Sequence, residues 1–129
     1  MDTDRSPESI AYAAAEELRA LNHRTFDADA FTYPAEVQST ASGLNKLLQT
    51  LPQSLNQLTA GLNHVQQTRE LRTHDGSDVD QAVENARAGI ASALAHAELA
   101  QKALQGVVDG LALVGARYVP EDDEEPSIA

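Results

Sequence analysis

Apolar residues recur between positions 37 and 65 in steps that alternate strictly between four and three. This spacing is typical of one stripe along a coiled-coil helix. The stripe consists of Val37, Ala41, Leu44, Leu48, Leu51, Leu55, Leu58, Leu62 and Val65. At roughly 2 kcal/mol for each buried leucine, its six leucines represent on the order of 10 kcal/mol if they leave water. The stripe therefore predicts a long helix that must pack against a partner surface.

A second segment, from about residue 78 to residue 119, repeats the same alternation. Its stripe consists of Val79, Val83, Ala86, Ile90, Ala93, Ala97, Ala100, Leu104, Val107, Leu111, Val114 and Tyr118. Small residues occupy its middle, so a leucine-rich helix could approach closely, large side chain against small. A short polar connection around Gly76 separates the two stripes, and Asp78 with Gln81 resembles a capping box. Together these features predict an antiparallel helical hairpin.

Pro52 interrupts the first stripe between Leu51 and Leu55. An interior proline removes one backbone hydrogen bond and costs about 3 kcal/mol. Two interpretations are open: one helix over about 34–72 that is kinked at Pro52, or two helices that meet there. The unbroken heptad phase across the proline favours the kinked helix, because a loop would normally reset the phase.

A shorter helix is predicted near the N-terminus, over about residues 7–22. Ser6 and Pro7 form a favourable start for it, and residues 1–5 read as a flexible leader. Phe26 and Phe31 bracket the break that follows. We interpret that break as a connecting loop whose rings cover the end of the bundle, with an aromatic ligand site as the alternative.

The predicted fold class is all-α, because no run of residues alternates with period two as strands do. The chain has 129 residues, so we expect one domain over residues 6–119. The expected architecture is a long antiparallel hairpin with coiled-coil-like heptads plus the short N-terminal helix. Either that helix covers the remaining apolar residues, giving a three-helix monomer, or a second copy does, giving a four-helix or larger bundle. The helix is too short to cover the whole rod, so we favour completion of the bundle by homodimerisation.

Net charge argues against several kinds of partner. The chain carries 20 acidic and 9 basic residues, for a formal charge of −11, and such a chain repels nucleic acids and anionic membranes. No apolar run is long enough to span a bilayer. The acidic start lacks the features of a conventional signal peptide. We therefore expect a cytoplasmic protein, and an acidic disordered tail over residues 120–129.

Sequence patterns that carry chemistry are absent. The chain has no cysteine, and its four histidines do not share a helix face at metal-ligand spacing. The acidic cluster between Asp75 and Asp80 lacks the spacing of a calcium loop and is better explained by helix capping. We therefore predict no catalytic, metal-binding or cofactor-binding residue, and no enzymatic activity.

Two family resemblances can be stated. Leu21-Asn22-His23, Tyr33-Pro34-Ala35-Glu36-Val37 and Leu51-Pro52-Gln53-Ser54-Leu55 resemble a family of small uncharacterised actinomycete proteins, often found beside mobile-element genes, and this implies no activity. The acidic hairpin is also similar to the WXG family, whose members are exported by type VII secretion. That family carries a Tyr-x-x-x-Asp/Glu signal, which Tyr118 and Asp122 match, although the turn has Gly76 without the family's tryptophan.

The favoured function is a non-enzymatic scaffold or interaction module that associates with itself or with a protein partner. Its predicted partner-binding residues are Leu44, Leu48, Leu51, Leu55, Leu58, Leu62, Ile90, Leu104 and Leu111. One alternative is a WXG-like hairpin exported without a conventional signal peptide, in which Tyr118 and Asp122 would form the signal. Another is an acidic partner that masks a basic protein surface with residues 121–125.

Overall fold

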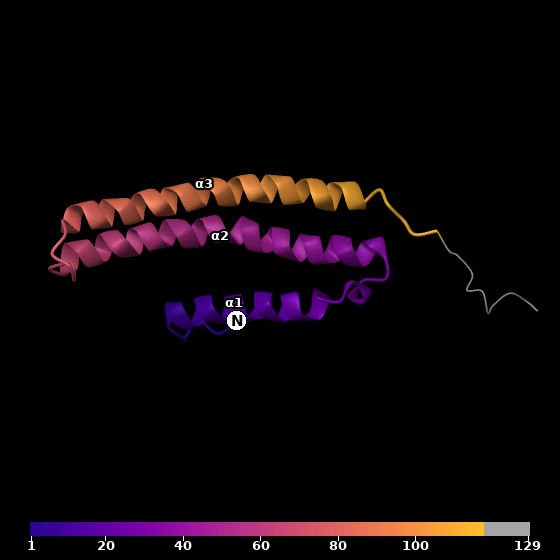
Figure 1. Cartoon of the computed structure of the whole chain (residues 1–129), viewed down its shortest axis with the longest axis horizontal. Helices are drawn as coiled ribbons and strands as arrows, with labels where there is room; N and C mark the ends of the chain where they lie inside the picture. The colour runs from indigo at the N-terminus through magenta and orange to yellow at the C-terminus, as the bar shows by residue number, and fades with distance from the viewer. Residues whose placement is uncertain (118–129) are drawn as a thin grey trace, which may run out of the picture. The chain divides into compact units, whose positions relative to one another are not determined.

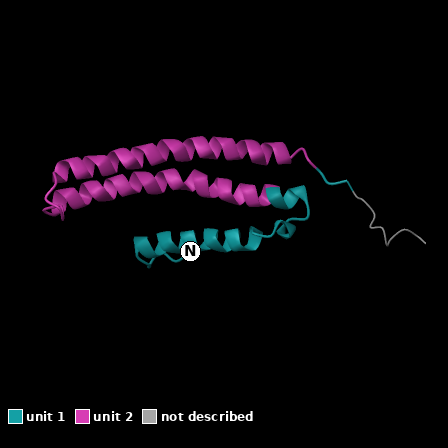
Figure 2. Cartoon of the chain, in the orientation of Figure 1, with its two compact units in different colours: residues 1–37, 115–129 teal, residues 38–114 magenta. Residues whose placement is uncertain are grey.

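Three α-helices and one short 3-10 turn make up the computed structural model, which describes residues 1–117 (Figure 1). The elements are α1 (Pro7–Thr25), η1 (Ala28–Ala30), α2 (Pro34–Thr68) and α3 (Val79–Leu111). Over these described residues there is no strand, and the all-α prediction is confirmed. The chain divides into two compact units, one of residues 38–114 and the other of residues 1–37 with the segment from Gly115 onward (Figure 2).

The unit that includes residues 1–37 contains α1, which starts as its sequence predicts. Ser6 caps the helix, since its hydroxyl accepts a hydrogen bond of 3.3 Å from the Ser9 amide. The helix runs three residues beyond the predicted end, to Thr25. None of its residues is fully buried. Phe26 is 93% exposed, and Phe31 is half-buried.

The unit of residues 38–114 is a hairpin in which α2 and α3 pack against each other (Figure 2). Helix α2 continues through Pro52 without interruption, so the interpretation with two separate helices is wrong. It ends at Thr68, four residues before the predicted end.

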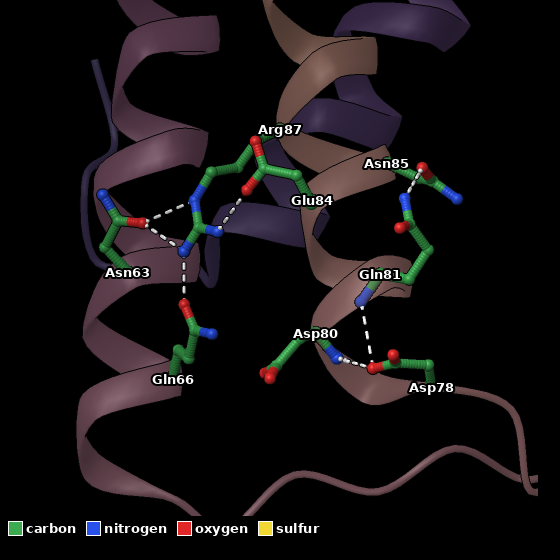
Figure 3. Close-up of polar contacts among 8 residues, drawn as sticks. All are labelled: Asn63, Gln66, Asp78, Asp80, Gln81, Glu84, Asn85 and Arg87. Carbon is green, nitrogen blue, oxygen red and sulfur yellow. Dashed lines mark hydrogen bonds and ion pairs between the residues drawn. The ribbon is translucent and has the colours of Figure 1, made fainter.

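Capping explains where α3 begins and contributes to where it ends. The Asp78 carboxylate accepts hydrogen bonds from the amides of Asp80 and Gln81, at 2.9 and 3.3 Å (Figure 3). The helix ends at Leu111, short of the predicted residue 119, and the Ala112 amide donates to the Val108 carbonyl at 3.1 Å. Gly106, Gly110 and Gly115 lie around this end, and glycine is a poor helix former.

The connection between α2 and α3 comprises residues 69–78. Gly76 has a φ of +77°, a left-handed conformation that glycine adopts without steric cost. The Asp75 carboxylate accepts hydrogen bonds from the Ser77 amide and hydroxyl, at 3.1 and 2.6 Å. These local bonds hold the chain in the turn that reverses its direction.

Candidate interaction face

The buried surface of α2 does not coincide with the stripe that its sequence suggests. One series of buried and half-buried residues follows steps of three and four, in the order Gln38, Ala41, Asn45, Leu48, Pro52, Leu55, Thr59, Leu62 and Gln66. Thr40, Leu44, Leu51 and Asn63, beside this series, are also half-buried. Only every second member of the predicted stripe belongs to this series. The other members of the series are Pro52 and four polar residues, and they lie one position after Val37, Leu44, Leu51, Leu58 and Val65. The helix is therefore rotated toward its polar side relative to the expected contact.

Helix α3 is rotated in the same sense. Its inner residues are Val79, Val83, Arg87, Ile90, Leu94, Ala97, Gln101, Leu104, Val108 and Leu111. The predicted stripe members Ala86, Ala93, Ala100, Val107 and Val114 are all exposed. The expectation that the two full stripes pack against each other inside the hairpin is therefore wrong for these five residues and for Val37, Leu58 and Val65, which are also exposed.

Hydrogen bonds of Arg87 explain part of this rotation. Its Nε and Nη2 donate to Asn63 Oδ1 at 3.0 and 2.8 Å, and Nη2 also donates to Gln66 Oε1 (Figure 3). Nη1 donates to the Glu84 carboxylate at 3.2 Å, which forms an ion pair within α3. The guanidinium thus joins the two helices near the turn through several hydrogen bonds, and its charge strengthens them.

A second polar cluster joins the helices further from the turn. Asn45 is the most buried polar residue of the described chain, at 4% exposure. Its Nδ2 donates to Gln105 Oε1 at 2.7 Å, and its Oδ1 accepts from Gln101 Nε2 at 3.3 Å. Gln38 Nε2 donates to the Val108 carbonyl at 3.1 Å. We call the residues of both clusters the polar layer: Gln38, Asn45, Asn63, Gln66, Arg87, Gln101 and Gln105.

The polar layer shows which sides of the two helices meet. Asn63 follows the inner residue Leu62 and contacts Arg87, while Gln105 follows the inner residue Leu104 and contacts Asn45. Positions directly after these inner residues therefore adjoin on one side of the hairpin in both helices. Residues directly before polar inner residues such as Asn45 and Arg87 lie on the other flank of each helix. These residues, Leu44 and Ala86 among them, therefore adjoin on the opposite side of the hairpin.

Two columns of mostly exposed residues make up that opposite side. We call Leu44, Leu51, Leu58 and Val65 the leucine column of α2, and Ala86, Ala93, Ala100 and Val107 the alanine column of α3; Val114 lies just beyond the end of this helix. Together the two columns form the apolar face. Leu58, Val65, Val107 and Val114 are 58%, 43%, 44% and 52% exposed, whereas Leu44 and Leu51 are half-buried.

The predicted binding residues divide between the two environments. Leu48, Leu55, Leu62, Ile90, Leu104 and Leu111 are inner residues of the hairpin. Leu44, Leu51 and Leu58 belong to the apolar face. The alanine column was missing from the predicted binding residues, because its regular spacing read as packing inside the hairpin. The alanine column repeats every seven residues in the sequence. This spacing indicates that the column contacts another surface, but it does not identify that surface.

Charge is unevenly distributed over the helices. Between residues 38 and 68, the hairpin part of α2, Lys46 is the single charged residue, whereas the 33 residues of α3 include six charged ones. No charged residue lies in the apolar face. Charged residues are depleted in the cores of protein interfaces, so the composition of this helix is typical of a covered surface.

Other parts of the described chain offer little that resembles a chemical site. All four histidines are exposed, and His96 Nδ1 lies 2.7 Å from the Ser92 carbonyl oxygen of its own helix. Two depressions open to solvent, one lined by residues that include Gln66, Arg69 and Val79, and the other by Arg19, Asn22, His23 and Phe26. Within residues 1–117, no group of three or more histidine or acidic side chains is placed to hold a metal ion.

Hydrogen bonding shifts the titration of one turn residue. The Ser77 hydroxyl, and then the Ser77 amide, stabilise the charged form of Asp75 and lower the pKa of its carboxyl. The carboxyl is fully exposed. This shift is explained by turn formation and needs no catalytic role.

Comparison of the chain with protein-family models, curated proteins and solved structures finds no match. Tyr118, Asp122 and residues 121–125 lie outside the described residues. None of the described helices is both long and apolar enough to cross a membrane. Function must therefore be inferred from the geometry of the hairpin itself.

Proposed function

We propose that this protein is a non-enzymatic interaction module whose apolar face binds a helical protein surface. The observation that carries the proposal is the exposure of Leu58, Val65 and the alanine column on one side of the hairpin, in line with the half-buried Leu44 and Leu51. Because each column repeats every seven residues, the face extends along the hairpin as a stripe suited to another helix.

Energetics support a covered face. Each leucine that moves from water into an interface stabilises the complex by roughly 2 kcal/mol, and contiguous exposed apolar patches on soluble proteins commonly mark interaction sites. Hydrogen bonds already satisfy the opposite, polar side within the hairpin. The apolar face is therefore the surface on which binding gains the most free energy.

Thiol labelling in the producing cell tests this proposal. The chain has no cysteine, so Leu58→Cys places a unique thiol on the apolar face, and Gln57→Cys places one on the neighbouring exposed position. If a protein covers the face, a membrane-permeant maleimide should modify Leu58→Cys several-fold more slowly than Gln57→Cys. Both should react alike after denaturation. Equal rates in the native state would contradict the proposal.

Export as a helical hairpin is the second candidate, because the antiparallel pair of α2 and α3 is the architecture that the WXG resemblance implies. In the first candidate the protein acts in the cytoplasm, and in this one it is delivered outside the cell. Replacing Tyr118 and Asp122 together by alanine should abolish export, with Glu124→Ala as the control. Undiminished export of the double variant would rule out this signal.

A further inference from the structure

We infer that the partner of the apolar face is a second copy of the same chain, with the leucine column of each copy against the alanine column of the other. This inference rests on the proposed interaction function and names its partner. It predicts a four-helix assembly built from two hairpins.

Dimensions of the face favour a second hairpin. At about 1.5 Å per residue, α2 and α3 are each roughly 50 Å long, and two adjacent helices are about 20 Å wide. The face thus has an outline of roughly 1,000 Å², close to the about 800 Å² that each partner contributes to a stable interface. Helix α1, with 19 residues, is about 28 Å long and could cover only about half of this length. A second hairpin matches it in length and width.

The heights of the two columns along the hairpin decide whether two copies of the apolar face can fit together. The bonds between Asn63 and Arg87 place these residues level with each other across the hairpin. Counting five residues back along α2 from Asn63 and five forward along α3 from Arg87 brings Leu58 level with residue 92, next to Ala93. The same counting brings Leu51 level with residue 99, next to Ala100. Leu51 and Leu58 thus lie at the height of alanines of the other column, whereas Leu44 comes level with residue 106, next to Val107.

A two-fold axis parallel to the helices makes use of this register. The rotation keeps every residue at its height and brings α2 of one copy over α3 of the other, in antiparallel orientation. Leu58 then faces Ala93 of the second copy, and Leu51 faces Ala100, so that large side chains meet small ones. An axis perpendicular to the helices would instead place leucine on leucine and alanine on alanine, which leaves gaps along the alanine columns.

Charge is compatible with this contact. The copies repel each other overall, because each carries a net charge of −11. The apolar face itself contributes no charge, so no ionic group must be desolvated when two faces meet. A strongly basic partner, by contrast, would find no carboxylate on this face.

The first part of the test measures solution mass by light scattering on a sizing column, with the full chain. The wild type and Gln57→Asp should elute with twice the chain mass of 13.8 kDa, and Leu58→Asp should elute as a monomer. Ala93→Trp should also dissociate the dimer, whereas Ala95→Trp, on a neighbouring exposed position, should not. Circular dichroism should show unchanged helix content in every variant, because all four positions are exposed in the isolated hairpin.

The second part identifies the arrangement by disulfide formation. A mixture of Leu58→Cys and Ala93→Cys chains should form a covalent dimer under mild oxidation, faster than either variant alone. If Leu51→Cys alone forms a covalent dimer more efficiently than this mixture does, leucine faces leucine and the proposed arrangement is overturned.

Failure of this inference is distinguishable from failure of the proposed function. If the wild type is a monomer and the purified Leu58→Cys variant still labels slowly, another part of the chain covers the face. This result would overturn the inference that a second copy is the partner. A monomer with fast labelling when purified and slow labelling in the cell would indicate a different protein as partner. Fast labelling in both settings would overturn the interaction function as well.

Discussion

At the scale of single residues, the connection between α2 and α3 depends on backbone geometry and local hydrogen bonds. Gly76 is the one position among the described residues with a positive φ. An L-residue in that conformation costs about 1–2 kcal/mol. Gly76→Ala should therefore lower the free energy of unfolding by about that amount, measured by urea denaturation. Gly106→Ala is the control: it lies in helical backbone with open space at its Cβ position, and should stabilise the chain by about 0.5–1 kcal/mol.

Asp75 offers a prediction about pH. Because hydrogen bonds from Ser77 lower the pKa of its carboxyl in the folded chain, the unfolded chain binds the proton more tightly. The group therefore contributes stability above its unfolded pKa, and this contribution is lost as the pH falls through the lowered folded pKa. Ser77→Ala should raise the pKa of Asp75, as followed by NMR titration. An unchanged titration would show that the hydroxyl bond is not formed in solution.

At the scale of elements, α2 continues through Pro52 although a proline inside a helix is unfavourable. Pro52 occupies a half-buried inner position, and its ring replaces a backbone N–H that would bond to the Leu48 carbonyl. Pro52→Ala should therefore raise the free energy of unfolding, by up to about 3 kcal/mol. Thermal melting by circular dichroism measures this change. A lower melting temperature would mean that the ring contributes packing that alanine cannot replace.

The pairing of α2 with α3 depends on the polar layer as well as on apolar contacts. Arg87→Ala removes the donors that reach Asn63, Gln66 and Glu84, and should lower the free energy of unfolding by about 1–3 kcal/mol. Lys102→Ala, an exposed cation of the same helix, is the control and should change it by less than about 0.5 kcal/mol. Equal effects in the two variants would show that the guanidinium bonds contribute little.

At the scale of the whole molecule, net charge opposes self-association while the apolar face favours it. Added salt screens the repulsion between two copies of charge −11. The dissociation constant of the proposed dimer should therefore fall as the salt concentration rises from about 50 mM to about 500 mM, which shortens the screening length roughly threefold. Sedimentation equilibrium measures this change. A dissociation constant that rises with salt would indicate that ion pairs, and not the apolar columns, hold the copies together.

The sequence alone determined the helices, their caps and the hairpin, because these depend on local chemistry. The heptad spacing identified both long helices, and Ser6, Pro7 and Asp78 marked the starts of α1 and α3. Only the tertiary structure decided which side of each stripe lies between the helices. Either of two adjacent columns satisfies the same alternation of three and four. The choice depended on whether polar residues such as Asn45 and Arg87 could find partners across the hairpin. Those partners lie 24 to 60 residues away in the chain, so periodicity along one helix cannot reveal them, and the remaining apolar columns are left for another surface.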